Sequence, residues 1–236
     1  GVFASLGTGD LATKTGTAAD EANRRFFYAP DVALMNSGSA SWINVAIGSG
    51  HREKPITDQT AINRFYSLRD YNVFTTVASD QYKATCLSTE TAPCHEIITD
   101  AGTTRPVDVT GDITPTIPAR GVGWKMDLQD LGEKVLAESR TFQNKIYITT
   151  YSPQKRVPRP EFCSATVGLN RLYIVDAATA KPVTNLDTAV GGDLTIEDRS
   201  TELAQGSIAP EVIFVFPTPP LVTPDVPPAN CASTPG

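Results

Sequence analysis

The stretch WINVAIGSGHREKPITDQTAINRFYSLRD, residues Trp42 to Asp70, decides the fold. It contains two apolar runs, 42–47 and 65–68, which are separated by a Gly-Ser-Gly break and a polar loop. Short runs that are rich in aromatic and β-branched residues and end at glycine and polar clusters are typical of strands. We therefore predict two strands in this stretch and no helix.

The second of these runs recurs later in the chain. Residues 63–70 read NRFYSLRD and residues 170–176 read NRLYIVD, 107 positions further on, while NKIYI at 144–148 is a weaker copy. A strand with one buried face needs a neighbour that covers it, so recurring strands indicate stacked units. A β-propeller blade has about 40 to 50 residues, and the spacing would then span two blades. A β-sandwich with two similar strands is the alternative.

Length, charge and hydropathy limit the possible partners. The 236 residues can form one all-β unit, and they carry a net charge of −6 with a pI of about 5.0. A nucleic acid partner is not expected, because phosphate neutralisation needs clustered Lys and Arg. No apolar run approaches the ~20 residues that cross a bilayer, so no membrane-spanning segment is expected. The opening GVFASLGTGD has no signal peptide, and we expect a processed or partial piece of a longer protein.

The four cysteines suggest disulfides. Cys86 and Cys94 would close the nine-residue loop CLSTETAPC, and Cys163 with Cys231 would fix the Pro-rich end of the chain. Both bridges would favour an oxidising compartment, the periplasm or the cell surface. A metal or nucleophile site at Cys94 and His95 is the competing interpretation, which we do not favour because the chain has two histidines and no Cys-x-x-Cys.

The remaining pattern predicts more strands and one long excursion. Strands are expected at 32–35, 73–77, 123–128, 140–151, 169–175, within 191–198 and at 210–217. The last of these would be placed to pair with the first blade. Residues 79–118 contain few apolar runs and many Thr, Asp, Gly and Pro residues, which is typical of a long surface insertion.

No catalytic or metal site is expected from the residues alone. Asp100, Asp108 and Asp112 lie close together, but they lack the EF-hand spacing and are better explained as turn formers. Ser49 between two glycines lacks the Gly-x-Ser-x-Gly elbow, and the adjacent His51 is poorly placed to act as its base. We interpret His51 as a packed or hydrogen-bonded residue at a strand end.

A set of motifs, taken in order, resembles the carboxy-terminal propeller of the PilY family of type IV pilus biogenesis factors and tip-associated adhesins. The motifs are NRRFFYAPDV, VAIGSGHR with RFYSLRD, GWKMDL followed by GEKVL, the Thr-Phe before IYITTYSP, and NRLYIVDA, within residues 23–183. The matching positions, which we take as structural, are Arg25, Phe26, Tyr28, Pro30, Asp31, Gly48, Gly50, Arg52, Arg64, Tyr66, Asp70, Trp124, Asp127, Arg171, Tyr173 and Asp176.

The resemblance implies a fold and a place in the cell. Residues 1–216 would form the carboxy-terminal part of a modified, quinoprotein-like β-propeller, a partial propeller with long loop insertions such as 79–118. Residues 217–236 would form a Pro-rich tail. The protein would be exported through the periplasm and outer membrane to the cell surface and the pilus tip. Its partners would be minor pilins and a host or abiotic surface.

The implied function is a non-enzymatic pilus assembly and adhesin module that supports pilus biogenesis, attachment and twitching motility. Some family members use a calcium loop of closely spaced Asp residues, and because this chain shows no such loop we expect no cofactor. Two alternatives remain: a quinoprotein-like propeller enzyme and a purely structural surface fibre module. The enzyme would need a quinone pocket with an Asp base beside calcium, and the sequence offers no identifiable set.

Overall fold

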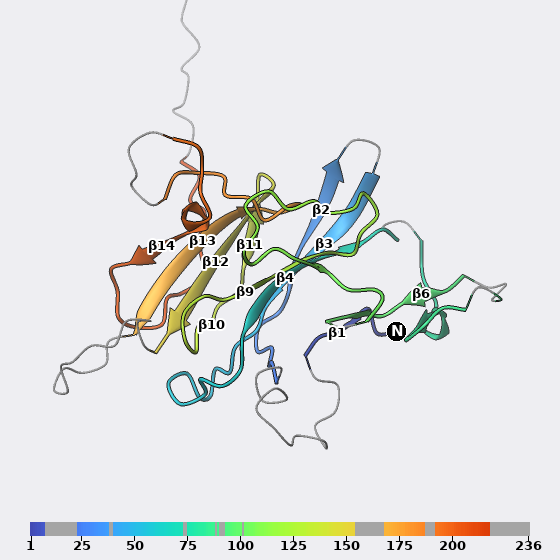
Figure 1. Cartoon of the computed structure of the whole chain (residues 1–236), viewed down its shortest axis with the longest axis horizontal. Coiled ribbons are helices and arrows are strands. Elements are labelled where there is room, and N and C mark those ends of the chain that lie inside the picture. The colour runs from blue at the N-terminus through green and yellow to red at the C-terminus, as the bar shows by residue number, and fades with distance from the viewer. Residues whose placement is uncertain are drawn as a thin grey trace, which may run out of the picture.

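The structure, a computed structural model, describes residues 1–7, 23–37, 40–72, 75–87, 89, 93–100, 102–153, 168–186 and 192–217. Within these residues the fold is built from strands and two short 3-10 helices, which confirms the all-β prediction. Two five-stranded sheets dominate the molecule, and neither closes on itself (Figure 1). No helix among the described residues is long and apolar enough to cross a membrane.

The first sheet has the order β2-β3-β4-β9-β8. Its strands are β2 (Asp31–Ser37), β3 (Ala40–Gly48), β4 (Arg64–Asp70), β9 (Gly123–Asp127) and β8 (Val107–Asp108). The first four are antiparallel, and β8 adds to β9 in parallel. These strands are rich in residues that the fold buries: in β3 every second residue from Trp42 to Gly48 is buried and the residues between them are half-buried, and in β4 residues 65–69 are all buried.

The second sheet has the order β10-β12-β13-β14, and β11 also pairs with β12. Its strands are β10 (Lys134–Val135), β11 (Arg140–Phe142), β12 (Lys145–Ser152), β13 (Leu169–Asp176) and β14 (Ser200–Leu203). All of its pairings are antiparallel. The predicted run 140–151 is divided by a two-residue turn, Gln143 and Asn144, with φ values of 49° and 61°. Positive φ at both turn residues suits the twist of a tight hairpin.

The repeated sequence occupies equivalent places in the two sheets. The copy at 63–70 forms β4 and the copy at 170–176 forms β13, and each strand has a partner on both sides. The weaker copy at 144–148 lies in β12, beside β13. Recurrence in the sequence therefore corresponds to recurrence of an interior strand.

The two sheets pack against each other through one apolar core. Its buried members are Met35, Trp42, Ala46, Phe65, Val109, Trp124, Met126, Leu128, Val135, Ile146, Ile148, Tyr173, Val175, Ala177 and Ala180. Polar contacts also join the sheets, because the carbonyl of Ala177 after β13 accepts hydrogen bonds from Trp124 Nε1 at 2.9 Å and Ser67 Oγ at 3.0 Å. Both donors belong to the first sheet, so the turn after β13 is fixed to β4 and β9.

A smaller cluster covers the other face of the first sheet around β4. Tyr66, Leu68 and Ile98 are its buried members. Residues near the start of the chain pack over them, and β1 (Ala4–Ser5) pairs in parallel with β7 (Ile98–Thr99). This cover stops short of β2, where Val32 and Leu34 are exposed.

Three predicted strands are not found. The segment 210–217 forms no strand and belongs to no sheet. Prolines bound it, and its Phe214 ring packs on Phe142 and Tyr147. In the described part of 191–198 there is no strand. A 3-10 helix, η2 (Glu197–Arg199), stands at its end, and β14 follows it. Of 73–77, residues 75–77 form no strand, and the first two lie outside the described residues.

Candidate functional site

The Arg-x-Tyr pair of the first repeat copy binds carboxylates. Arg64 forms a charged hydrogen bond with Asp127, its register partner on β9. Tyr66 Oη lies 3.0 Å from both carboxylate oxygens of Asp100. The two side chains point to the same side of β4, because they are two residues apart.

Asp100 is the counterion of this cluster. Its carboxylate lies 3.0 Å from Arg24, 3.3 Å from Arg64 and 3.9 Å from Lys125. Burial raises the pKa of the Tyr66 hydroxyl, so it remains a hydrogen-bond donor at neutral pH. Burial also lowers the pKa of Lys125. The arrangement neutralises charge inside the fold and ties residues from four segments together.

The second copy repeats this chemistry on another loop. Arg171 Nε donates to Asp130 at 2.7 Å, and Tyr173 Oη donates to Glu133 at 2.9 Å. Both acids lie in the loop between β9 and β10. The repeated motif thus serves in each sheet to bind an acidic residue of a neighbouring strand or loop.

Glu133 is the most enclosed acid of this group, with 2% of its surface exposed. It accepts hydrogen bonds from the Thr150 hydroxyl at 2.6 Å and from the backbone N–H groups of Gln129 and Asp130 at 2.8 and 2.9 Å. Burial raises the pKa of Glu133 in spite of these donors. A perturbed acid is often functional, but both oxygens of this one are engaged by internal hydrogen-bond donors.

The Gly-Ser-Gly motif is explained by close packing on β10. A Cβ atom added to Gly48 would lie 2.2 Å from Val135 Cγ2, and one added to Gly50 would lie 2.6 Å from the Val135 carbonyl. Only glycine lets the strand end approach this closely. The buried hydroxyl of Ser49 donates to Asn63 at 3.1 Å, so it is a structural group.

His51, the next residue, is also held by internal contacts. Its Nδ1 lies 2.8 Å from an Asp58 carboxylate oxygen and its Nε2 lies 3.2 Å from Arg25. Its ring stacks on Phe27 with the centroids 5.7 Å apart. These contacts agree with a packed, hydrogen-bonded histidine at a strand end.

Two motif residues reach the surface in an open groove of about 310 Å³. The groove is lined by Tyr28, Arg52, Leu136, Ala137, Glu138, Ile208, Ala209, Pro210 and Glu211. The Arg52 guanidinium lies over the Tyr28 ring, 5.3 Å from its centroid. Arg140 bridges the two acids of the groove, 3.1 Å from Glu138 and 2.7 Å from Glu211. The groove therefore combines an aromatic ring with paired charges at the surface.

Other motif residues make internal contacts or stand at the ends of strands. The Phe26 ring packs on Tyr66 with centroids 6.1 Å apart. Pro30 precedes β2, which Asp31 begins. Asp70 ends β4 and accepts the N–H of Asn72 at 2.9 Å. Asp176 ends β13, and its carboxylate accepts the N–H groups of the next turn at 2.8 and 3.1 Å.

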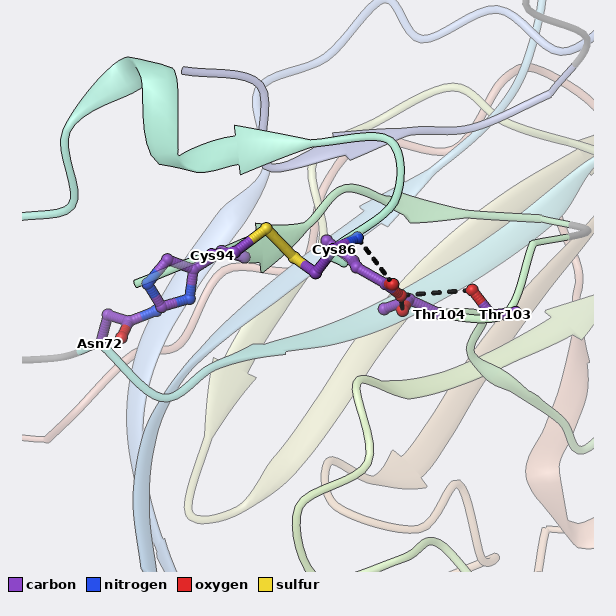
Figure 2. Close-up of a disulfide and its surroundings, with 7 residues drawn as sticks. Asn72, Cys86, Cys94, Thr103 and Thr104 are labelled. Atoms are coloured by element: carbon purple, nitrogen blue, oxygen red, sulfur yellow. Dashed lines mark hydrogen bonds between the residues drawn. A yellow bond between two sulfur atoms is a disulfide. The ribbon is translucent and has the colours of Figure 1, made fainter. Parts of the chain in front are cut away.

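The excursion 79–118 carries a lobe closed by the predicted disulfide between Cys86 and Cys94 (Figure 2). The lobe contains η1 (Ser79–Gln81) and β5 (Tyr82–Lys83), which pairs with β6 (His95–Glu96). It lies to one side of both sheets in Figure 1. The other predicted pair, Cys163 and Cys231, lies outside the described residues.

Glu96 fastens the lobe to the following loop, in which Thr103 and Thr104 lie near Cys86 in Figure 2. Its carboxylate accepts hydrogen bonds from the Thr104 hydroxyl, from the Cys86 N–H at 3.1 Å and from the Thr103 hydroxyl at 3.2 Å. These donors, Thr104 first, lower the pKa of Glu96. Leu87, beside the disulfide, is 62% exposed. The lobe is thus internally cross-linked and presents an apolar side chain to solvent.

The three aspartates considered for calcium have different roles. Asp108 and Asp112 form turns by accepting the N–H groups of Thr110 and Thr114, at 3.0 and 2.9 Å. These two fit the turn-former interpretation, whereas Asp100 is the counterion described above. Within the described ranges, no group of three or more His, Cys, Asp or Glu side chains could hold a metal ion.

A buried arginine that the sequence did not indicate binds the backbone of the turn at residues 109–112. The Arg199 guanidinium donates to the carbonyls of Val109 at 2.7 Å and Asp112 at 2.5 Å, and Arg199 itself is fully buried. It reaches this turn from η2, about 90 residues later. The sequence gives no periodic signal for such a contact, because it depends on tertiary packing.

Comparison with known proteins yields one distant similarity. No protein-family model matches the chain, and no curated protein matches it significantly. Among solved structures, it is similar to the crystal structure of the Pseudomonas aeruginosa PilY1 C-terminal domain, with 15% identity and a TM-score of 0.45. The match covers 84% of this chain and 43% of that chain, so the present chain spans less than half of the length of that protein.

Proposed function

We propose that this chain is a non-enzymatic binding and assembly module of the PilY type, which acts in type IV pilus biogenesis. The observation that carries the proposal is the ordered set of motifs in residues 23–183. The contacts of the motif residues support it, because Arg64 and Tyr66 in one sheet and Arg171 and Tyr173 in the other bind acids in the same way. On this proposal the two sheets are neighbouring blades of a modified, quinoprotein-like propeller.

The enclosed state of the reactive groups supports a role without catalysis. Glu133 and Tyr66 have raised pKa values because they are buried, and both are engaged by internal partners. Ser49 donates to Asn63, and His51 contacts Asp58, so neither serves the other. We propose that the protein needs no cofactor for its function.

Recognition is assigned to the disulfide lobe of the excursion 79–118. Its cross-link and the exposed Leu87 support this assignment, since long loops on a rigid scaffold commonly carry binding function. A disulfide at this position also fits an oxidising compartment, and we propose the cell surface and the pilus tip. The proposed partners are minor pilins, with a host or abiotic surface contacted by the assembled tip.

The proposal is tested by affinity capture of minor pilins from the source bacterium. The bait is the natural protein with either its native sequence, Leu87→Asp or Leu131→Asp. Leu131 is 53% exposed and lies outside the lobe, so it is a matched control. We expect native protein and Leu131→Asp to retain minor pilins, and Leu87→Asp to retain at least about tenfold less.

Piliation and twitching motility of strains that carry the same variants provide the second readout. Loss of both in the Leu87→Asp strain alone would support the assignment. Absence of minor pilins from every capture, together with normal piliation after deletion of the gene, would overturn the pilus role. Quinone-dependent oxidation of an alcohol or sugar by the purified protein would overturn its non-enzymatic character.

A further inference from the structure

The strand β2 (Asp31–Ser37) forms an edge of the first sheet, and β11 lies close to it without pairing with it. β2 pairs with β3 on one side, and no backbone hydrogen bond from the described residues reaches its other side. Natural edge strands are commonly protected by Pro, Lys or a bulge, and the sequence DVALMNS contains no Pro or Lys. Val32 and Leu34, on the same face, are each 58% exposed. An edge of this kind can accept a further strand.

The segment Val212 to Phe216 has a strand-forming sequence but no strand to pair with. Its sequence VIFVF is strongly strand-forming, yet the segment belongs to no sheet. Ile213 is 75% exposed and Val215 is 85% exposed, whereas Phe214 between them packs on the rings of Phe142 and Tyr147 at 4.8 and 4.9 Å. The segment is therefore held to the protein through Phe214, while Ile213 and Val215 face solvent.

Its own chain does not place this segment on β2. Glu211 is paired with Arg140 at 2.7 Å, and Phe214 packs on Phe142 and Tyr147, so the segment follows the β11–β12 hairpin. Pro210 and Pro217 bound the segment and lack the N–H groups that a longer ladder would need. Five residues remain between Glu211 and Pro217, which fits within the seven residues of β2.

We propose that Val212 to Phe216 of one molecule adds as a strand to the β2 edge of a second copy of this chain. The addition would pair free backbone groups on both sides and would bring Val32 and Leu34 beside the apolar residues of the incoming strand. The donor segment and the acceptor edge are different surfaces. A dimer therefore retains one free donor and one free acceptor, and further copies can add head to tail. This inference does not depend on the proposed role in the pilus.

Two double variants test the inference. Each introduces positive charges on one of the two proposed contact surfaces. Val32→Lys with Leu34→Lys alters the acceptor, and Ile213→Lys with Val215→Lys alters the donor. All four residues are exposed, so the substitutions should leave the fold intact, which circular dichroism and thermal unfolding would verify. A control with Ile56→Lys and Leu131→Lys adds the same charge at residues that are 58% and 53% exposed elsewhere.

Sedimentation velocity over a concentration series gives the readout. We expect the native chain and the control to associate with concentration, and each of the two variants to associate at least about tenfold more weakly. An equimolar mixture of the acceptor and donor variants retains one intact donor and one intact acceptor, so it should form one-to-one dimers and nothing larger. A native chain that stays monomeric at high concentration, or a mixture that stays monomeric while the native chain associates, would overturn the proposal.

Discussion

Glu133 is a buried acid that is held by neutral hydrogen-bond donors and not by a basic side chain. One of its oxygens accepts the Thr150 and Tyr173 hydroxyls, and the other accepts two backbone N–H groups. Glutamine keeps one oxygen for the N–H groups, and its amide can donate to the two hydroxyls. We expect Glu133→Gln to change the free energy of unfolding by less than about 1 kcal/mol and Glu133→Ala to lower it by about 3 kcal/mol, measured by urea unfolding at pH 7. Equal losses in the two variants would contradict this account.

The same residue predicts a pH dependence. Burial raises the pKa of Glu133 above its ordinary value of 4.5, so the folded protein binds a proton that the unfolded chain has released. The stabilising contribution is therefore fully present below pH 4.5 and is lost as the pH rises through the folded pKa. Native protein should lose stability relative to Glu133→Gln over that interval, in urea titrations at successive pH values. A difference that stays constant with pH would show that Glu133 does not titrate in this way.

Asp100 and Asp108 are eight positions apart, but we expect their substitution by Ala to lower the free energy of unfolding by different amounts. The Asp100 side chain is 11% exposed and faces Arg24 at 3.0 Å, so Asp100→Ala removes the carboxylate that Arg24, Arg64 and Lys125 share. We expect a loss of about 3 kcal/mol in the free energy of unfolding. Asp108 is exposed and its side-chain hydrogen bonds are local, to Thr110, so Asp108→Ala should cost about 0.5 kcal/mol. Chemical denaturation of both variants measures the contrast, and comparable losses would refute the counterion role.

At the scale of elements, the disulfide lobe should open independently of the sheets. Closing a nine-residue loop contributes about 2.5 kcal/mol by restricting the open chain. Replacing Cys86 and Cys94 by Ser should therefore speed hydrogen exchange in β5 and β6 while exchange in β4 and β13 is unchanged, as mass spectrometry would detect. Reduction of the native protein should reproduce the pattern. Faster exchange throughout both sheets would mean that the lobe supports the whole fold.

The elements that the sequence predicted well are short apolar runs that end at glycine or polar residues. The runs 42–47, 65–68, 123–128 and 169–175 fall within or almost coincide with β3, β4, β9 and β13, because such runs form strands that are largely buried. The run 210–217 has the same composition but forms no ladder, since strand propensity does not provide a partner. The disulfide was predictable from spacing, whereas the contact of Arg199 with Val109 was not, because the two residues are 90 positions apart.

At the scale of the whole molecule, the repeat indicated stacked units, and the structure contains two sheets around one core. The partners of the repeated Arg and Tyr residues were not predictable, because Asp100 and Glu133 come from loops whose paths follow from packing. The surface groove at Tyr28 and Arg52 was likewise invisible, although both residues were marked by the motif comparison. Sequence therefore indicated which residues matter to the units but not which surfaces they create.

One shared core predicts that the two sheets unfold together. Trp42 and Trp124 are both buried in it, but only Trp124 has an indole hydrogen bond in the described part of the chain, to Ala177 of the second sheet. We expect Trp124→Phe to lower the free energy of unfolding by about 2 kcal/mol, and Trp42→Phe by about 1 kcal/mol less. In Trp124→Phe the fluorescence of Trp42 reports the first sheet and far-ultraviolet circular dichroism reports both, and the two transitions should coincide in urea. Separate transitions would mean that each sheet is stable alone and that the bond to Ala177 joins two independent units.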